Sequence, residues 1–243
     1  QLREAFRGAG LTEVLHYYLT SPAPQRVVLE NPLFTEYSAL RSDLLSGLMD
    51  GFQFNLEQGN GPLNAFEIGH VFANEDGQLN EYERIGGILG GNAAQGQWRG
   101  TTAPMTWYDA KGVLETVFLQ VGLDVDYRPD SEDERLHPGR TASLWVRSRT
   151  RLGTFGQLHP RLRQERDLPE EVYVFELSWE AISTCLVSDR FRAPKFKSYS
   201  SYPGSDRDIA FYAPTDVAVA DIAKLISRTG GQLLEKVFLF DEY

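Results

Sequence analysis

The chain has 243 residues, 42% hydrophobic and 12% aromatic, so it can bury a sizeable core. Its net charge of -10 argues against a generally basic nucleic-acid binder. The single cysteine, Cys185, excludes internal disulfides and a cysteine-based zinc cluster. The sequence has neither an apolar run of about 20 residues nor a signal-peptide layout, so we expect a cytoplasmic protein without a membrane partner.

In chain order, apolar spacing predicts a helix over residues 2–9 and a strand over residues 14–19. Ser42 is expected to cap a second amphipathic helix, which the Gly- and Pro-rich turn at residues 59–62 ends. The further predicted elements are strands at residues 66–72, 84–91, 141–147, 151–158 and 172–177, and a helix at residues 109–121.

Short connections between successive strands favour antiparallel pairing, so the predicted fold class is α+β. Residues 124–135 form a polar, acidic loop in this interpretation. We expect three parts: a core module over residues 1–190, a linker over 191–201, and a second unit over 202–243. In the second unit, a helix is predicted between strands at residues 208–213 and 237–240.

Positive charge is unevenly distributed. Residues 135–197 carry 12 basic and seven acidic side chains, which suits contact with a polyanion or an acidic partner but also fits a mixed solvated surface. From residue 10 to residue 83 the only basic side chains are Arg26 and Arg41. A site that binds ATP and an acid must place several cationic side chains around the phosphates, and this stretch has too few for a nucleotide-activating site.

The turn from His137 to Arg140 contains Pro138 and Gly139, and the guanidinium of Arg140 could bind a carboxylate or phosphate there. The alternative is a structural turn that holds a partner subunit or its own loop. The acidic group that precedes it could supply oxygen ligands for a hard metal or could be a solvated turn. That group comprises Asp130, Glu132, Asp133 and Glu134.

Other polar residues in the predicted strands give no catalytic constellation. His16 and His159 have no identifiable Ser, Cys or acid partner, so a nucleophilic triad has no support. Glu67 and Glu176 both lie in strands and could serve as acid and base, but structural hydrogen bonding is the alternative.

One basic segment interleaves cations with aromatic rings, which allows phosphate neutralisation and base stacking. The same pattern also fits an interdomain linker. The candidate RNA contacts are Arg190, Arg192, Lys195 and Lys197, together with Arg207 further on.

Taken in order, the anchors of the chain resemble the β subunit of bacterial-type phenylalanine-tRNA ligase. The order and spacing of the pieces, which span essentially the whole sequence, carry this resemblance. They are residues 11–14, Asn31-Pro32, Leu40-Arg41-Ser42-Asp43-Leu44-Leu45, Phe66-Glu67-Ile68-Gly69, Asp109-Ala110-Lys111-Gly112, His137-Pro138-Gly139-Arg140, Gly156-Gln157-Leu158-His159-Pro160, Tyr202-Pro203 and Arg207-Asp208-Ile209-Ala210.

The resemblance implies a class II synthetase-like antiparallel sheet flanked by helices that has lost catalysis. Its α partner carries the active site in an α2β2 assembly, and the β subunit helps to present tRNA(Phe). ATP and magnesium are then cofactors of the whole enzyme, with no cofactor, metal or catalytic residue assigned to this chain. In this light Arg41 is expected to be structural.

The resemblance also implies that residues 202–243 are the start of a ferredoxin-like anticodon-binding domain. We expect this incomplete domain to be poorly ordered or abnormally paired. Two other functions stay open: an independent RNA-binding module built on residues 135–197, and an enzyme that itself adenylates a carboxylic acid.

Overall fold

The computed structural model describes residues 1–91, 103–187, 196, 198–199 and 201–242. Contacts divide the chain into two units, Gln1–Lys195 and Phe196–Tyr243. Within the described residues, no helix combines the length and apolarity needed to cross a membrane.

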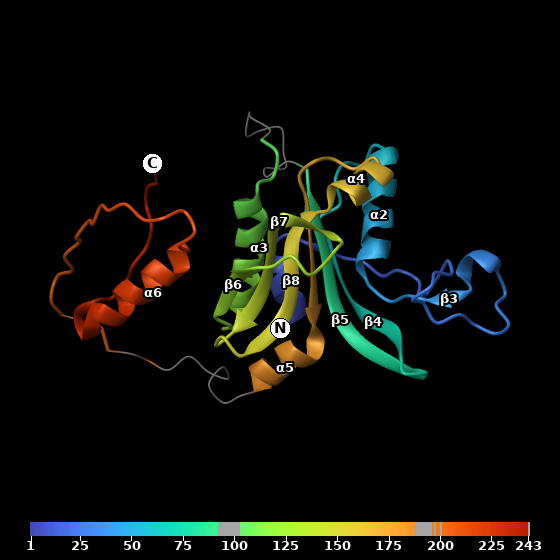
Figure 1. The fold of residues 1–243 in the computed structure, drawn as a ribbon, viewed down its shortest axis with the longest axis horizontal. Coiled ribbons are helices and arrows are strands. Elements are labelled where there is room, and N and C mark those ends of the chain that lie inside the picture. The colour runs from blue at the N-terminus through green and yellow to red at the C-terminus, as the bar shows by residue number, and fades with distance from the viewer. Residues whose placement is uncertain (92–102, 188–195, 197, 200, 243) are drawn as a thin grey trace. The chain divides into compact units, whose positions relative to one another are not determined.

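A seven-stranded sheet forms the centre of the first unit, in the order β1-β4-β5-β9-β8-β7-β6 (Figure 1). The strand β1 pairs with β4 in parallel, and every other neighbouring pair in this sheet is antiparallel. The strands are β1 (Thr12–Glu13), β4 (Ala65–Glu75), β5 (Gln78–Gly90), β6 (Val125–Pro129), β7 (Leu136–Val146), β8 (Thr150–Leu158) and β9 (Val172–Ser178). The predicted α+β class and largely antiparallel sheet are confirmed.

Helices cover both faces of the sheet, with α3 and α2 on opposite sides (Figure 1). On one face, Phe6 stacks on Phe66 and Phe175 with ring centroids 4.9 and 5.6 Å apart. On the other, Leu48 and Phe52 pack on residues such as Ile88. The helices of this unit are α1 (Leu2–Gly8), α2 (Leu45–Glu57), α3 (Trp107–Gln120), α4 (Pro160–Glu165) and α5 (Trp179–Val187).

Three local predictions in the first unit were wrong. Residues 14–18 form no strand, because β1 ends at Glu13 and the next strand, β2 (Leu19–Thr20), pairs instead with β3 (Ala39–Leu40). Residues 125–129 are strand β6, in which Tyr127 pairs with Leu144 of β7, rather than loop. Ser42 does not cap α2, because the N-cap position is Leu44; instead, Asp43 Oδ1 accepts a 2.7 Å hydrogen bond from the Ser46 amide in the first turn.

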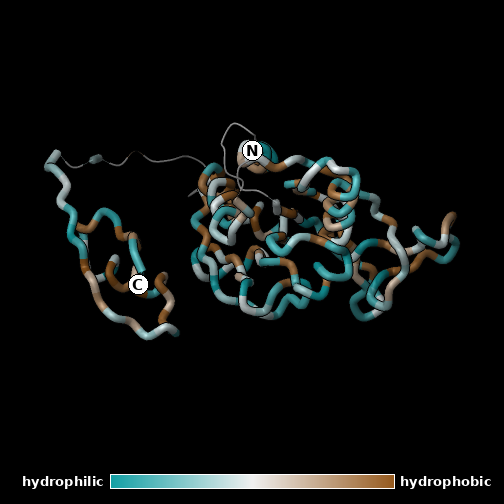
Figure 2. The backbone as a smooth tube through the Cα atoms, turned by 90° about the horizontal axis from the view of Figure 1, so that it is seen from above, coloured by the Kyte–Doolittle hydropathy of each residue, from teal (hydrophilic) through white to brown (hydrophobic). Residues whose placement is uncertain are grey.

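In the second unit the described residues form one α-helix, α6 (Val219–Thr229), and a short 3-10 turn, η3 (Gly231–Leu233). The predicted strands at residues 208–213 and 237–240 do not form. A strand needs a neighbour for its amide groups, and these segments find none within the described residues of this unit. Apolar residues on the predicted helix face, including Ile222 and Ile226, are only half-buried, and hydrophobic stretches recur along this unit in Figure 2.

Candidate functional site

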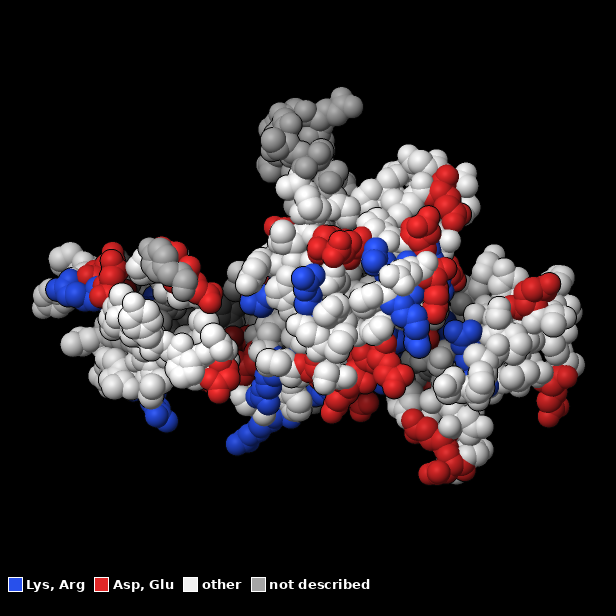
Figure 3. All heavy atoms as spheres, turned by 45° about the horizontal axis from the view of Figure 1, so that its top comes forward, with Lys and Arg blue, Asp and Glu red and all other residues white. Residues whose placement is uncertain are grey.

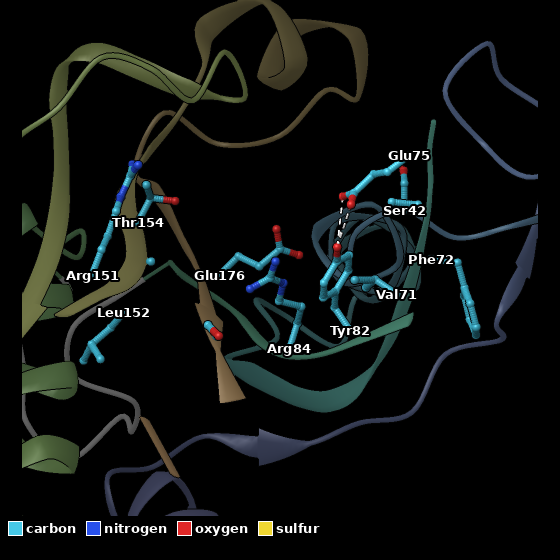
Figure 4. Close-up of a pocket in the computed structure, with 13 residues that line it drawn as sticks. Ser42, Val71, Phe72, Glu75, Tyr82, Arg84, Arg151, Leu152, Thr154 and Glu176 are labelled. Atoms are coloured by element: carbon cyan, nitrogen blue, oxygen red, sulfur yellow. Dashed lines mark hydrogen bonds between the residues drawn. The ribbon is translucent and has the colours of Figure 1, made fainter. Parts of the chain in front are cut away.

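An open groove of about 460 Å³ lies on the α2 side of the sheet, beside the part that α2 covers. The side chains of β4, β5, β8 and β9 that point to this face line it, because alternate residues of a strand share a face. Figure 4 shows Glu75 and Tyr82 on one side, Arg151 and Thr154 on the other, and Arg84 and Glu176 between them.

Both arginines of the groove contact other side chains of the protein, Arg151 two carboxylates and Arg84 an aromatic ring. Arg151 forms ion pairs with Asp130 at 2.9 Å and Glu132 at 3.0 Å. The guanidinium carbon of Arg84 lies 5.3 Å from the centre of the Tyr82 ring. The Tyr82 hydroxyl in turn donates to Glu75, and this bond raises the pKa of the phenol. Of the two arginines, Arg151 is therefore already paired with carboxylates, which leaves less free positive charge for a triphosphate than a nucleotide-activating site needs.

A second network joins the groove to the base of α2. Arg135 Nη1 contacts Glu176 Oε2 at 2.9 Å, and its Nη2 contacts Asp133 Oδ2 at 2.7 Å. Glu176 Oε1 also accepts a 2.8 Å hydrogen bond from the Leu44 amide. Burial alone would raise the pKa of Asp133, but hydrogen bonds from Arg135 and Thr154 and the charge of Arg135 lower it overall.

The acidic group at residues 130–134 provides the carboxylates for these arginines. Asp130 and Glu132 bind Arg151, and Asp133 binds Arg135. Within the part of the chain that the structure describes, no three acidic, His or Cys side chains are grouped to hold a metal. Three of the four carboxylates of this group thus serve as partners for arginines.

The buried carboxylate of Glu67 has two cationic or polar partners, which the sequence did not reveal. Its Oε1 accepts from Arg41 Nη1 and its Oε2 lies at His16 Nδ1, both at 2.6 Å. Desolvation would raise the pKa of Glu67, yet the hydrogen bonds from His16 and Arg41 outweigh it and hold the pKa below 4.5. The expectation that His16 has no acid partner was therefore wrong.

Arg41 has the structural role predicted for it. It is 5% exposed, and its Nε donates to the His70 carbonyl at 2.8 Å. Its Nη2 lies over Gly69, where an added Cβ atom would overlap it, so a larger residue there would displace the guanidinium. The guanidinium also lies 4.5 Å from the Tyr18 ring centre. Arg41 thus fastens residues 16–18 to β4.

Glu67 and Glu176 share one face but do not form an acid–base pair. Both align with Gly86 of β5, so they are two strands apart, or about 10 Å. Leu44 lies against Gly86, since a Cβ there would be 2.8 Å from Leu44 Cβ. The two carboxylates have separate partners on either side, which favours the structural alternative.

The segment from His137 to Arg140 is a bulge within β7. Leu136 pairs with Leu158 and Thr141 with Gly156, so four residues of β7 lie opposite one residue of β8. His137 Nδ1 accepts from the Gly139 amide at 3.0 Å. Arg140 is exposed and donates to Gln157 at 2.9 Å. The predicted turn is present, but as a strand bulge fixed by its own histidine.

Of the five candidate RNA contacts, the structure describes only Arg207, so it does not show whether they lie together. Arg190, Arg192, Lys195 and Lys197 lie outside the described residues. Arg207 is exposed in the second unit, where it donates to Ser205 Oγ at 2.6 Å and to the Asp206 carbonyl at 2.7 Å.

The first unit resembles solved aminoacyl-tRNA synthetases in fold. Two structures of a pyrrolysyl-tRNA synthetase from Desulfitobacterium hafniense superpose with TM-scores of 0.54 and 0.56 at 14% identity. Each covers 76% of this chain, and the chain covers 65% and 67% of them. The fold is that of the class II aminoacyl-tRNA synthetases.

Sequence comparison identifies the family. The model of the phenylalanyl tRNA synthetase beta chain CLM domain matches residues 1–179, and that of the ferredoxin-fold anticodon binding domain matches residues 200–243. The chain belongs to the phenylalanyl-tRNA synthetase β-chain family.

Among its relatives are the phenylalanine–tRNA ligase β subunits of Trichormus variabilis, Synechococcus elongatus and Gloeobacter violaceus, at 56%, 52% and 45% identity. All three alignments include 100% of this chain. The chain spans only 30% of the length of the first two relatives and 31% of the third.

Proposed function

We propose that the chain acts within the β subunit of a phenylalanine-tRNA ligase, as a non-catalytic scaffold for the α subunit that also contacts tRNA(Phe). The phenylalanine would be attached to tRNA at the active site of the α partner, in a cytoplasmic α2β2 enzyme that uses ATP and magnesium. The observation that carries this proposal is the family match, which extends in order along the chain.

The groove supports the non-catalytic part of the proposal. Catalysis of adenylation needs cations that are free to meet developing phosphate charge. Arg151 is already paired with two carboxylates, and Glu75 and Glu176 add negative charge to the same face. A triphosphate entering this groove would therefore meet repulsion from these carboxylates, as well as an Arg151 that is already paired.

The division of labour within the chain is part of the same proposal. Residues 1–190 would form the scaffold, 191–201 the linker, and 202–243 the beginning of the anticodon-binding domain. His137 and Arg140 would shape an interface turn. The tRNA contacts would be Arg190, Arg192, Lys195, Lys197 and Arg207.

Binding and exchange assays test this function. The purified chain is mixed with the α subunit of the Trichormus variabilis enzyme, and complex formation is followed by sedimentation velocity. We expect a complex with a dissociation constant in the micromolar range or tighter. Phenylalanine-dependent exchange of pyrophosphate into ATP should be at background for the lone chain.

Either of two results would overturn the proposal. Exchange catalysed by the lone chain would indicate an adenylating enzyme. Failure to bind the α subunit at tens of micromolar, by a chain whose circular dichroism shows it to be folded, would remove the scaffold role.

A further inference from the structure

The turn that ends α2 contains the dipeptide Asn60-Gly61. Of the seven asparagines in the sequence, Asn60 alone is followed by a glycine. An asparagine side chain lies close to the backbone nitrogen of the next residue, and glycine leaves that nitrogen unhindered because it has no side chain. This dipeptide is therefore the place in the sequence where an asparagine side chain reacts most readily with the backbone.

The end of the helix fixes the backbone that leads into Asn60. The Asn60 amide donates to the Asn55 carbonyl at 2.9 Å, and the Gly59 amide donates to the Leu56 carbonyl at 3.0 Å. Gly59 has a φ of 71°, so these two bonds and the left-handed residue form a Schellman motif. Asn60 therefore lies just outside the helix, at a defined position.

Neither reacting group is held by a strong hydrogen bond within the described part of the chain. Asn60 is exposed, and its Nδ2 donates to Asn55 Oδ1 at a long 3.3 Å. The Gly61 amide donates to no acceptor among the described residues. A bonded amide keeps its proton and its position, whereas the Gly61 nitrogen can lose its proton and turn toward the Asn60 side chain.

Two other asparagines provide a comparison within the same chain. Asn55 lies in α2, where its Nδ2 donates to the Gly51 carbonyl at 2.8 Å. Asn80 lies in β5, where its Nδ2 donates to Glu75 Oε2 at 3.0 Å. The residue after each of them belongs to the same helix or strand, so its nitrogen reaches the side chain only after local unfolding.

We propose that Asn60 is a site of spontaneous deamidation. The Gly61 nitrogen attacks Asn60 Cγ, the bond from Cγ to Nδ2 breaks, and Nδ2 leaves as ammonia with the proton of the Gly61 amide. Water then opens the resulting cyclic imide. Cleavage of the new bond gives aspartate, and cleavage of the original backbone bond gives isoaspartate, in which the backbone runs through the former side chain.

Either product places a negative charge beside the end of α2. The last residue of this helix is Glu57, and the helix sequence has no Lys or Arg to compensate for it. Figure 3 shows acidic side chains over the part of the surface that α2 and α4 form. A carboxylate is unfavourable at a helix C-terminus, whose carbonyl groups carry partial negative charge. The product also loses the hydrogen bond from Nδ2 to Asn55, so the reaction weakens the end of the helix.

Isoaspartate also lengthens the backbone between α2 and β4. The far end of this connection is fixed, because the Asn64 carbonyl accepts from the Thr12 amide and Asn64 Oδ1 accepts from the Gly90 amide, both at 2.9 Å. Between the two ends, Pro62 lies against Gly91, where an added Cβ would be 2.2 Å from Pro62 Cγ. An extra backbone atom has little room here, so the isoaspartyl form loosens the connection.

Mass spectrometry of the aged chain tests the proposal. The purified chain is kept in a mildly alkaline buffer and digested at acidic pH, so that the digestion itself does not cause the reaction. Mass distinguishes the amide from the acid, and fragmentation distinguishes aspartate from isoaspartate. We expect conversion of Asn60, with isoaspartate among the products, while Asn55 and Asn80 stay amides in the same sample. Asn60→Gln is the matched control, because glutamine must close a larger and less favourable ring. If Asn60 keeps its amide as long as Asn55 and Asn80 do, the proposal is wrong.

A second variant tests the effect on the helix. Asn60→Asp introduces the charge of the aspartyl product without ageing, and Asn60→Gln keeps the side chain neutral. We expect the midpoint of thermal unfolding of Asn60→Asp to lie about 2 °C below that of Asn60→Gln. Equal midpoints would overturn the claim that the new charge weakens the end of α2.

Discussion

Glu67 places a carboxylate inside the sheet, where its desolvation is unfavourable unless partners compensate for it. Arg41 supplies a charged, bidentate-capable group on one side, and His16 supplies a ring nitrogen on the other. Because His16 and Arg41 flank the segment of residues 17–40, the interaction links both ends of that segment to β4. Removing one partner measures the cost of leaving the other buried without its counter-charge.

Replacing Glu67 with Gln should lower the free energy of unfolding at pH 7 by about 3–5 kcal/mol, because Arg41 would remain buried without its counter-charge. Urea unfolding followed by circular dichroism measures the change. Glu134→Gln, at an exposed glutamate, is the control and should change stability by less than about 0.5 kcal/mol. An unfolding free energy that is equal in the two variants would show that the cluster does not stabilise the fold.

The same variant should alter the dependence of stability on pH. A carboxyl whose pKa is lowered by folding stabilises the protein above its ordinary pKa, here 4.5, and loses that contribution as the pH falls through the folded value. The unaltered chain should therefore lose stability below about pH 4.5, and Glu67→Gln should lose less over this range. Asp133, whose pKa is also lowered, keeps part of the acid sensitivity in both proteins.

The sequence showed which polar residues lie in the predicted strands, but not which other residues they pair with in the fold. The resemblance made Arg41 a candidate for a structural role, and the structure places it in buried contact with Glu67. A glutamate within an apolar strand implies a compensating partner, but His16 is 51 residues away in sequence and adopts no regular element. Arg135 was missed because its neighbours gave no signal beyond an acidic loop.

Among the strands, β5 shows how small residues set the packing of elements. Gly86 faces Leu44 and α2, and Gly87 faces the opposite side, where a Cβ atom would overlap the ring of Phe175. Glycine weakens a strand by its entropy, so its presence at both positions indicates close approach on both faces. The two glycines therefore let Leu44, at the start of α2, and the ring of Phe175 approach β5 from opposite faces.

Gly87→Ala should therefore destabilise the chain by about 1–3 kcal/mol, since Phe175 must leave its place in the core. Gly112→Ala is the matched change, because Gly112 lies in α3 with no atom within 4 Å of an added Cβ. It should stabilise the chain by about 0.5–1 kcal/mol. Thermal unfolding of both variants measures the difference, and a shift of equal sign in the two would contradict this account.

Helices and strands were predicted correctly where the apolar periodicity was strong. They were missed or misplaced where pairing with a distant strand determines the structure. The helix at residues 109–121 was found as α3 because its apolar stripe is continuous. Strand β6 was missed although Val125 and Tyr127 alternate with Asp126 and Arg128, because the strand has only five residues and lies within a polar stretch. The apolar run at residues 14–19 indicated a strand, but the chain leaves the sheet after Glu13 and next forms a strand at Leu19, which pairs with β3. Local sequence could not show that departure.

At the scale of the whole molecule, the two units differ in how much of their apolar surface they bury. The first contains fully buried clusters on both faces of its sheet. In the second, Ile209, Phe211 and Phe238 are all more than half exposed. A ferredoxin-like sheet interleaves strands that are distant in sequence, so the identity of the domain can be recognised from residues 200–243 while its strand pairing stays undetermined.

Hydrogen exchange can compare the two units in one experiment. Amide protection requires a hydrogen-bonded and buried backbone, and residues 208–213 have neither strand pairing nor buried side chains in the structure. We expect the amides of this segment to exchange at close to the rate of an unfolded peptide. Those of β5, such as Ile88 at the centre of the sheet, should be protected up to the free energy of global unfolding. Slow exchange at Ile209 or Phe211, comparable with that at Ile88, would mean that these residues pair as a strand after all, within the unit or with a second copy of the chain.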